Sequence, residues 1–444
     1  MNKFYFITLT MVLSVIFTGC HGNSGNTNSE DGPAMVEVLN RDGIYRLYVN
    51  GEEFFVKGAG CEFGDIRALA EHGGNAFRTW RTDNGQISGK EVLDQAHENG
   101  LMVMMGIEVG RERHGFDYDD SEWVARQKER IRQEVIELKD HPALLGWGIG
   151  NELNLHYTNM KVWDAVNEIS RMIHSIDKHH PTTTMLAGIS SKEVNYINEK
   201  CNDLDFLSVQ MYGDIINLQK RLTDAGYDGP YLVTEWGATG HWEVAMTEWG
   251  APIEQTSTEK ALALKERYEK AILADNKNCM GSFVFLWGQK QERTPTWYGL
   301  FTEDNQKMEA IDIMHYLWND EWPANRAPRI IEATIEGMGR YSNINLMPGK
   351  KYKAKLNYND PDNDNVTIVA EIMAESTDLG EGGDHEQKPP VIDTATEYPE
   401  DGIILFTTPA ETGPYRLFLY ALDGRGSAGT VNIPFMVTQN GSTW

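Results

Sequence analysis

The stretch Leu145-Gly146-Trp147-Gly148-Ile149-Gly150-Asn151-Glu152 is a short apolar run that stops at an amide and a carboxyl side chain. Short apolar runs of this kind are typical of strands buried on both faces, as in parallel sheets covered by helices. Similar runs recur from Glu53 to Trp287, and long amphipathic stretches separate them. This alternation predicts repeated β/α units around a parallel sheet.

Eight candidate strands can be placed on the sequence. They are Phe54–Ala59, Asn75–Trp80, Leu101–Ile107, Leu145–Gly150, Thr183–Ala187, Phe206–Tyr212, Tyr231–Glu235 and Ser282–Trp287. The helical patterns between them include Gly89–Asn99, Ser121–Lys139, Met160–Lys178 and Thr258–Asn276. Eight such units predict a (β/α)8 TIM barrel, a fold of about 250 residues. A doubly wound sheet is the alternative, but no glycine-rich phosphate motif follows the first strand, so the barrel is favoured.

The regions around the barrel differ from it in pattern. Residues 36–50 predict a β-hairpin with its turn at Arg41-Asp42-Gly43, which we expect to cap the barrel floor. With this hairpin, the barrel domain covers residues 35–322. Alternating short strands follow, so residues 323–444 predict an immunoglobulin-like β-sandwich. Its candidate strands are Ile330–Ile335, Lys351–Tyr358, Val366–Glu371, Gly402–Thr407, Pro414–Leu422 and Gly429–Val437.

An acidic turn lies within this second domain. Asp360-Pro361-Asp362-Asn363-Asp364 offers carboxylate oxygens, which suit a calcium ion. Aspartate is also common in ordinary turns, where its side chain accepts backbone hydrogen bonds. Both interpretations stay open, and the ordinary turn is the commoner one.

The first 34 residues predict targeting rather than fold. An apolar run from Phe4 to Phe17 follows Lys3, is too short for a permanent membrane helix and indicates an export signal. Small residues directly before Cys20 are similar to a bacterial lipoprotein signal, which implies a signal peptide at 1–19 and a lipid anchor in the membrane through Cys20. Residues 20–34 predict a flexible tether. We therefore expect an exported outer-membrane lipoprotein; secretion without an anchor is the alternative.

Composition narrows the possible partners. The 444 residues include 66 acidic and 40 basic ones, a formal net charge of -26, so charge repulsion argues against nucleic acid and polyuronates. Neutral ligands are favoured. Cys61, Cys201 and Cys279 are too scattered for a disulfide framework and predict small buried side chains. The histidines lack a paired ligand spacing, so we expect neither a metal nor a cofactor.

Two carboxyl groups end strands of the predicted barrel. Glu152 follows the fourth strand, and Glu235 ends the seventh. Barrel enzymes place their reactive groups at the carboxyl ends of the strands, so these two side chains should face each other across the mouth. Two carboxyls about 5 Å apart provide the nucleophile and proton donor of a retaining glycosidase. Arg78, near the end of the second strand, and Tyr212, which ends the sixth, could hold Glu235 ionised.

This arrangement resembles clan A of the glycoside hydrolases, a group of (β/α)8 barrels in which Asn-Glu ends strand four and a nucleophilic Glu ends strand seven. The resemblance covers residues 53–318. It implies that Glu152 is the acid/base, Glu235 the nucleophile, and Asn151 the residue that binds the sugar 2-hydroxyl. Trp287 matches the aromatic platform of the clan.

Other aromatic residues near strand ends are candidates for sugar contacts, because indole rings stack on the apolar faces of pyranoses. They are Trp80, Trp236, Trp242, Trp249 and Trp297. For Trp80, Trp242, Trp249 and Trp297, packing in the core or under a loop is as good an explanation as contact with a sugar. Burial near Trp147 or Trp236 could also raise the pKa of Glu152. The long loops at residues 108–120 and 236–257 should wall the cleft, and His156 and His241 lie near its mouth.

Within the clan the sequence most resembles glycoside hydrolase family 158. The residues that carry this resemblance are Gly73–Trp80, Lys139–Glu152 and Thr234–Gly237. It implies an endo-β-1,3-glucanase that hydrolyses laminarin-type glucans by double displacement, a barrel followed by an immunoglobulin-like domain, and an exported lipoprotein. An endo-β-mannanase or a β-1,3-glucanosyl transferase is the alternative within the clan. A non-catalytic surface glycan-binding lipoprotein is the alternative from another class.

Overall fold

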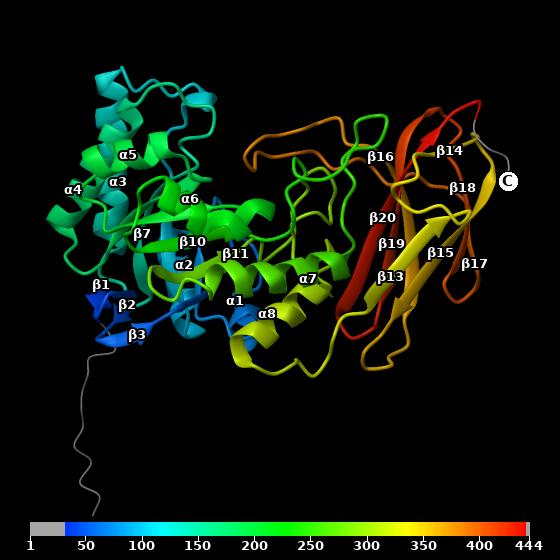
Figure 1. Ribbon diagram of the computed structural model, residues 1–444, viewed down its shortest axis with the longest axis horizontal. Helices are drawn as coiled ribbons and strands as arrows, with labels where there is room; N and C mark the ends of the chain where they lie inside the picture. Colours follow the sequence, from blue (N-terminus) through cyan, green and yellow to red (C-terminus); the bar gives the residue numbers. More distant parts are fainter. Residues whose placement is uncertain (1–31, 441–444) are drawn as a thin grey trace, which may run out of the picture.

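The computed structural model describes residues 32–440 and confirms the eight-stranded parallel barrel (Figure 1). Each strand pairs with the next one along the chain, and the last pairs with the first. The barrel strands are β4 (Val56–Gly60), β5 (Ala76–Arg78), β6 (Met102–Ile107), β7 (Leu144–Asn151), β8 (Thr182–Ala187), β9 (Phe206–Gln210), β10 (Tyr231–Trp236) and β11 (Cys279–Val284). The last strand therefore ends three residues before the predicted Trp287.

Helices surround the barrel, and several begin at side chains that cap their free backbone N–H groups. Ser88 and Thr256 form capping boxes with Glu91 and Glu259, and Asp120 accepts two backbone hydrogen bonds at the start of α3. The helices are α1 (Ile66–Glu71), α2 (Gly89–Glu98), α3 (Ser121–Leu138), α4 (Lys161–Ile176), α5 (Ser191–Lys200), α6 (Leu218–Asp224), α7 (Ser257–Arg267) and α8 (Glu309–Asn319). The four predicted helical patterns are all present.

A small antiparallel sheet closes the amino-terminal end of the barrel, as the sequence predicted. It contains β1 (Val36–Arg41), β2 (Ile44–Val49) and β3 (Glu52–Phe54). Asp42 and Gly43 both have positive φ, as a tight two-residue hairpin turn requires. Val36 and Leu47 pack against side chains inside the barrel, including Phe283. The sheet is drawn in blue below the barrel in Figure 1, so the opposite end is the open mouth.

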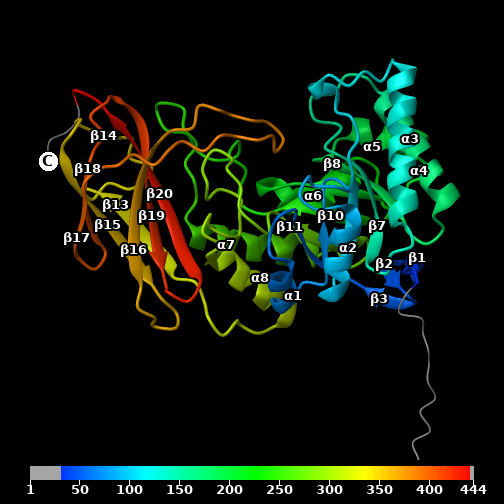
Figure 2. The ribbon, with the colours of Figure 1, turned by 180° about the vertical axis from the view of Figure 1, so that it is seen from behind.

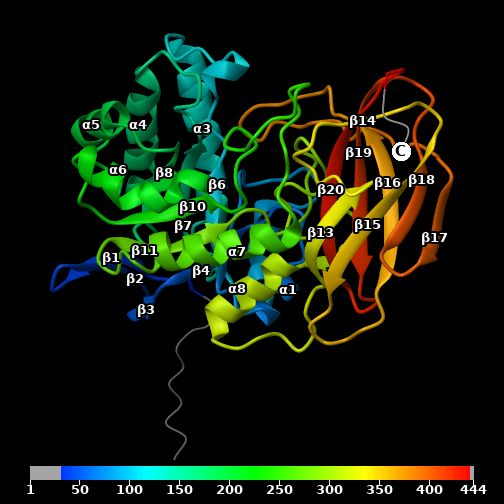
Figure 3. The ribbon, with the colours of Figure 1, turned by 45° about the vertical axis from the view of Figure 1, so that its right-hand side comes forward.

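Two further sheets form the carboxyl-terminal part of the chain and share one hydrophobic core (Figure 3). One contains β13 (Arg329–Ile335), β15 (Lys351–Asn359), β18 (Ile403–Thr407) and β17 (Thr396–Glu400). The other contains β12 (Lys307–Met308), β20 (Ser427–Val437), β19 (Gly413–Leu422), β16 (Thr367–Ala374) and β14 (Ile344–Leu346). All six predicted strands are present. We call these two sheets the β-domain; its immunoglobulin-like character stays a prediction.

The β-domain is joined to the barrel by more than its connecting segment. β12 precedes the predicted boundary at residue 323, yet it pairs with β20. At the interface, Glu254 is 2% exposed and forms an ion pair with buried Lys260. Its carboxylate also accepts hydrogen bonds from Thr294, Thr296 and Asn432 of β20 at 2.5–2.9 Å. Asn432 is the member of this network that comes from the β-domain, so the network is complete only when the two parts are docked, and it helps to hold the β-domain on the barrel.

Replacing Glu254 with Ala should destabilise the protein strongly. The change leaves the Lys260 ammonium buried without its partner, which costs about 3–5 kcal/mol. Thermal unfolding followed by circular dichroism should show a lower midpoint, whereas Glu137→Ala at an exposed position of α3 should leave it nearly unchanged. Equal midpoints for Glu254→Ala and the parent would show that this network does not hold the two parts together.

The predicted signal peptide and Cys20 lie outside the described residues, as does most of the tether, so export and lipidation stay predictions. Between residues 32 and 440 no helix has the length and apolar character needed to cross a membrane. Cys61, Cys201 and Cys279 are free and buried, as expected, and burial raises the pKa of each thiol to about 12. These thiols are therefore poor nucleophiles.

Candidate active site

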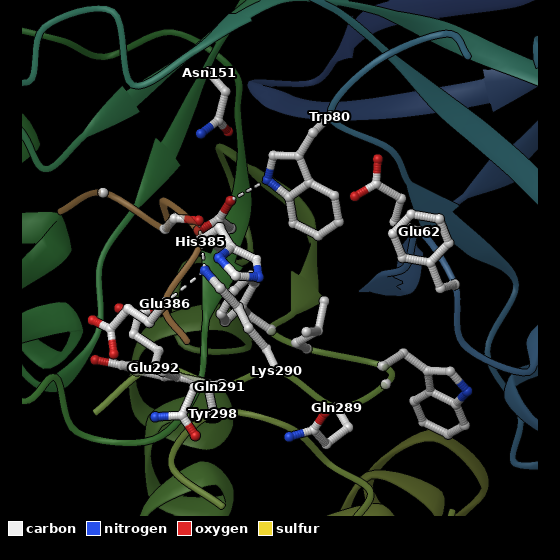
Figure 4. Close-up of a pocket in the computed structure, with 18 of the residues that line it drawn as sticks. Glu62, Trp80, Asn151, Gln289, Lys290, Gln291, Glu292, Tyr298, His385 and Glu386 are labelled. Carbon is white, nitrogen blue, oxygen red and sulfur yellow. Dashed lines mark hydrogen bonds and ion pairs between the residues drawn. The ribbon is translucent and has the colours of Figure 1, made fainter. Parts of the chain in front are cut away.

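A cavity of about 830 Å³ opens at the mouth of the barrel (Figure 4). Its size is in the range usual for small-molecule sites. Glu152 and Glu235 both line it, together with Asn151, Trp80 and Tyr212. The residues predicted to form the site from four different strands are therefore brought together around one space.

The backbone at the end of β7 explains how two neighbouring residues both reach the cavity. In a regular strand successive side chains point to opposite faces. Here the register between β7 and β8 shifts between Gly148 and Asn151, and Glu152 has a φ of 52° in the left-handed region. Such a conformation costs on the order of 1–3 kcal/mol for a residue other than glycine. It turns the Glu152 side chain toward the same cavity as Asn151.

The Glu235 carboxylate is held by three side-chain donors. Arg78 donates from Nη1 to Oε1 at 3.1 Å, and Trp80 donates from Nε1 to the same oxygen at 2.8 Å. The Tyr212 hydroxyl donates to Oε2 at 3.0 Å. Arg78 is fully buried and Glu235 is 5% exposed, so this ion pair is little screened by water. The three donors hold both oxygens of Glu235 and so fix the orientation of its side chain.

Tyr212 can act only as a donor to Glu235. Burial, followed by the charge of Glu235, raises the pKa of its phenol well above the usual value. The phenol therefore stays protonated at physiological pH. Trp80 was predicted to extend the cleft, and its hydrogen bond to Glu235, which Figure 4 marks with a dashed line, gives it a second role.

Glu152 has the opposite electrostatic environment. Burial of its carboxyl group, and then the charge of Glu235, raise the pKa of Glu152 to about 8. Arg113, Arg111 and Arg78 act in the other direction but are outweighed. At neutral pH Glu152 is therefore mainly protonated. The cavity thus holds one carboxylate with donors around it and one carboxylic acid.

Asn151 is fixed in orientation by two donors to its side-chain oxygen. Arg78 donates from Nη2 to Oδ1 at 2.7 Å, and Gln210 donates from Nε2 at 2.6 Å. The side-chain oxygen is therefore occupied, and the amide nitrogen is the group left to meet a ligand. Gln210 was missed in the sequence because it is an ordinary polar residue within β9. The available signal was its position at the carboxyl end of a barrel strand, where Gln210 is the last residue of β9.

Three tryptophans predicted to contact a sugar are buried. Trp287 borders the cavity, but its side chain is fully buried, donates from Nε1 to the Asp65 carbonyl at 2.8 Å and stacks on Trp318, so its role as a sugar platform stays a prediction. Trp236 is also fully buried and stacks on Tyr268 between barrel and helices. The reason is strand alternation, since Glu235 points into the barrel and its neighbour must point out.

Trp297 and Trp147 are also buried, and neither lines the cavity. Trp297 is 1% exposed and donates to the Thr239 carbonyl at 2.9 Å, so it supports a loop instead of lining the cavity. Trp147 is fully buried and donates to Asp177. Neither Trp147 nor Trp236 is among the residues that line the cavity containing Glu152.

Other aromatic side chains line the cavity. Phe285, which follows β11 and lies two residues beyond the barrel-core Phe283, packs against Trp80 and Tyr212. Tyr298 also lines the cavity, and Trp242 does so with 57% of its surface exposed. Trp242 was predicted; Phe285 was missed because the last strand was extended too far. The exposed ring of Trp242 is the one most available for stacking on a sugar.

The predicted walls are partly observed. The loop after β6 contributes Glu108, Val109 and Arg111 to the cavity, and the loop after β10 contributes Trp242. Trp249, in the second loop, is placed elsewhere, beside Glu375 of the β-domain. A further part of the lining was not predicted because it comes from the β-domain: Gly382, Gly383, His385, Glu386, Gln387 and Lys388.

The histidines near the mouth have structural partners. His156 forms an ion pair with Glu381 at 3.0 Å. His241 is half-buried under Trp242, and burial lowers its pKa to about 4, so it is neutral. Neither belongs to the cavity lining.

The acidic turn at residues 360–364 is distant in sequence from the site and has its own hydrogen bonds. The Asp360 carboxylate accepts from the backbone N–H groups of Asp362 and Asp364 at 3.0 and 2.9 Å, and Arg425 pairs with Asp364. These contacts are those of an ordinary aspartate turn. Calcium binding stays untested.

Comparison with known proteins supports the barrel and its class. The family model for the TIM-barrel domain of glycosyl hydrolases family 2 matches residues 63–319. No curated protein matches the chain. A GH2 β-galacturonidase from Eisenbergiella tayi bound to glycerol has 17% sequence identity and a TM-score of 0.50, with 66% of this chain and 55% of that chain covered.

Two further solved structures give similar values. A β-D-glucuronidase from Dictyoglomus thermophilum has 16% identity and a TM-score of 0.50, covering 65% of this chain and 54% of that chain. β-Glucuronidase 2 from Bacteroides uniformis, covalently bound to cyclophellitol-6-carboxylate aziridine, has 15% identity and a TM-score of 0.50, covering 91% and 48%. The present chain thus spans about half the length of these proteins, and the likeness concerns the fold.

Proposed function

The chain belongs to glycosyl hydrolase family 2 through its TIM-barrel domain, and on that premise we propose that it is a retaining β-glycosidase with Glu235 as nucleophile and Glu152 as acid/base. One observation carries the proposal: the same cavity contains Glu235, whose two side-chain oxygens accept from three donors, and Glu152, whose pKa is raised to about 8. A positioned carboxylate nucleophile and a protonated acid are the two groups that a double displacement requires.

Family 2 belongs to clan A, the clan that the sequence motifs indicated, but it is not family 158. The motifs around Glu152 and Glu235 occur in several families of the clan, so they identify the clan better than the family.

In the first step, an oxygen of Glu235 attacks the anomeric carbon, and the bond from that carbon to the leaving-group oxygen breaks. Glu152 transfers its proton to the leaving oxygen, so the alcohol departs neutral. Arg78, Trp80 and Tyr212 position the attacking carboxylate, since they hold both of its oxygens. The amide nitrogen of Asn151 is placed to bind a hydroxyl group of the sugar.

In the second step, water hydrolyses the glycosyl-enzyme. Once Glu235 is esterified it carries no charge, so one of the two causes that raise the pKa of Glu152 is gone. The lower pKa suits Glu152 as the base that takes a proton from the water. Release of the sugar with its original anomeric configuration then restores both groups.

The charges around the cavity favour a neutral sugar. Arg81 pairs with Glu62 at 2.5 Å, Lys290 pairs with Glu292 at 2.9 Å, and Lys388 pairs with Glu303. Among the described cavity residues most cations are thus already neutralised by carboxylates, which leaves little to attract an acidic sugar. We therefore propose a neutral β-glucan as the substrate, with β-1,3 linkages as the specific case suggested by the sequence.

A uronide is the second candidate, and it rests on one residue. Arg111 lines the cavity and donates from Nε to the Asn151 carbonyl at 3.2 Å, and burial lowers its pKa. It forms no ion pair within 4 Å in the described structure, so its guanidinium could meet a carboxylate. The related structures are glucuronidases and galacturonidases, which makes the comparison worth testing.

A substrate panel distinguishes these proposals. The purified protein should hydrolyse aryl β-glucoside and laminarin oligosaccharides with a higher kcat/KM than aryl β-glucuronide, β-mannan or β-galacturonide, and without forming longer transfer products. Preference for a uronide would overturn the neutral substrate and implicate Arg111. Absence of turnover on every glycoside would overturn the glycosidase and favour a glycan-binding protein.

A further inference from the structure

A loop of the β-domain reaches over the mouth of the barrel. It comprises residues 376–388, between β16 and β17, and is called the strap here. Figures 1 and 2 show this segment in orange, extending from the β-domain toward the loops above the barrel strands. Six of its residues, at positions 382, 383 and 385–388, line the cavity that contains Glu152 and Glu235.

The tip of the strap is held by the loop after β6. Arg113 donates from Nη1 to Asp384 at 2.9 Å and to the Glu381 carbonyl at 3.0 Å. Its Nη2 donates to the Gly382 carbonyl at 3.3 Å. The Arg113 side chain is 8% exposed, so its side of these contacts is largely shielded from water. His114 adds a contact to Asp384 at 3.1 Å.

The carboxyl-terminal part of the strap is held by the loop after β11. Glu386 is 2% exposed and accepts from the backbone N–H of Arg293 at 2.6 Å and from its Nη1 at 2.7 Å. Arg293 has a φ of 62°, an uncommon conformation that the contacts to Glu386 help to hold. Lys290 donates to the Gly383 carbonyl at 2.7 Å.

The tip of the strap fits closely against the barrel. Gly382 has a φ of 56°, and a Cβ atom at this position would lie 2.4 Å from Cδ2 of Leu155 and 3.0 Å from Nη2 of Arg113. Real Cβ atoms do not approach other atoms this closely, so an added Cβ would require a shift of the strap tip or of the ends of the Leu155 and Arg113 side chains. The left-handed backbone of Gly382 also favours glycine.

Alternate side chains of the strap make different contacts: one set binds the barrel domain and the other faces the cavity. Asp384, Glu386 and Lys388 bind Arg113, Arg293 and Glu303 of the barrel domain. His385 and Gln387, which lie between them, line the cavity and are exposed. Neither side chain has a hydrogen-bond partner within the described residues, and Figure 4 shows His385 among the labelled cavity residues.

We propose that the strap is a substrate-binding element and that His385 and Gln387 bind hydroxyl groups of a sugar unit next to the one whose bond is cleaved. The proposal rests on the glycosidase function argued above. Imidazole and amide groups each donate and accept, which suits neutral sugar hydroxyls. Because two barrel loops already hold the strap in place before the ligand binds, little conformational entropy is lost on binding.

The test compares two substrates of different length. His385→Ala combined with Gln387→Ala should lower kcat/KM about 10–100-fold on an oligosaccharide of the preferred glycan, since each lost hydrogen bond is worth about 3–10-fold. The same double variant should change kcat/KM on the aryl monoglycoside by less than about twofold, because that substrate has no second sugar. His97→Ala, on exposed α2 surface, is the matched control. Equal losses on both substrates, or no loss on either, would overturn the proposal.

A second pair of variants tests the position of the strap without removing its side chains. Gly382→Ala should reproduce the selective loss on the oligosaccharide. Gly337→Ala should not, because Gly337 has a similar φ of 78° but no atom within 4 Å of the added Cβ. A loss with both variants would point to general destabilisation and contradict the assignment.

A binding measurement tests the role of the strap independently of whether the protein is a glycosidase. If the parent hydrolyses no glycoside, the proposed function fails, and calorimetric titration of the same oligosaccharides still reports on the strap. The parent should then bind them at least 10-fold more tightly than the His385→Ala, Gln387→Ala double variant. Equal affinities would overturn the strap's role.

Discussion

Glu235→Gln should lower kcat for glycoside hydrolysis on the order of 10⁴-fold or more, while the protein stays folded and still binds its substrate. Glutamine has nearly the same shape as glutamate but cannot attack the anomeric carbon. Its side-chain oxygen can still accept from Arg78 and Trp80, and the Tyr212 hydroxyl can turn to accept from the new amide. The loss should therefore appear in kcat and leave the substrate dissociation constant within a few-fold.

The control for this variant is Glu248→Gln, at an exposed position of the loop after β10. It makes the same chemical change outside the cavity and should retain full activity. A Glu235→Gln enzyme that keeps more than about a tenth of the parent rate would remove Glu235 as nucleophile. Unfolding of Glu235→Gln by circular dichroism would contradict the expectation that its three donors tolerate an amide.

Glu152→Ala should produce a loss that depends on the leaving group. Without the acid, glycosides with poor leaving groups should lose about 10²–10⁴-fold in kcat/KM. Aryl glycosides with acidic phenols need little protonation, so their first step should be much less affected. Azide should then restore turnover of these activated substrates, because a small anion can attack the glycosyl-enzyme without a base. Equal losses on all substrates together with no effect of azide would contradict the acid/base role.

The same residue determines the alkaline side of the pH profile. The pKa of Glu152 is raised to about 8, so the protonated form needed for the first step predominates below that pH and is lost as the pH rises through it. In the parent, kcat/KM on a poor leaving group should therefore fall above about pH 8. In Glu152→Ala this alkaline decrease should be absent. Its persistence in the variant would assign the decrease to another group.

The barrel and its two carboxyl groups could be predicted because they follow from local sequence. Parallel barrel strands are short apolar runs, and their carboxyl ends meet at one mouth, so the residue after each run can be placed without a structure. Glu152, Glu235, Arg78 and Tyr212 were found in this way. The side-chain environment that raises the pKa of Glu152 could only be outlined, because it depends on the charge of Glu235 and the depth of the cavity.

The aromatic lining was harder to predict, since a single residue changes which face a side chain occupies. Extending the last strand to Trp287 drew attention to a fully buried residue that stacks on Trp318, whereas Phe285 was passed over, although it lines the cavity and packs against Trp80 and Tyr212. Trp236 was assigned to the site because it adjoins Glu235, but neighbours on a strand point in opposite directions. In these cases the distance from Glu235 or from the strand end along the chain did not show which face of the strand a side chain occupies.

The strap could not be predicted, because its contacts join residues far apart in sequence. Arg113 and Asp384 are separated by 271 residues and Arg293 and Glu386 by 93, and neither end has a local motif. Docking of the β-domain brings these partners together. The strap is thus a part of the site that depends on the arrangement of the two domains.

The central claim is that Glu152 and Glu235 act on one bond by double displacement. The most direct test is proton NMR of the sugar released in the first seconds of hydrolysis, before the anomers equilibrate. The account predicts that the first product is the β-anomer, the same configuration as in the substrate. Initial release of the α-anomer would mean a single displacement by water, and the assignment of Glu235 as nucleophile would be wrong.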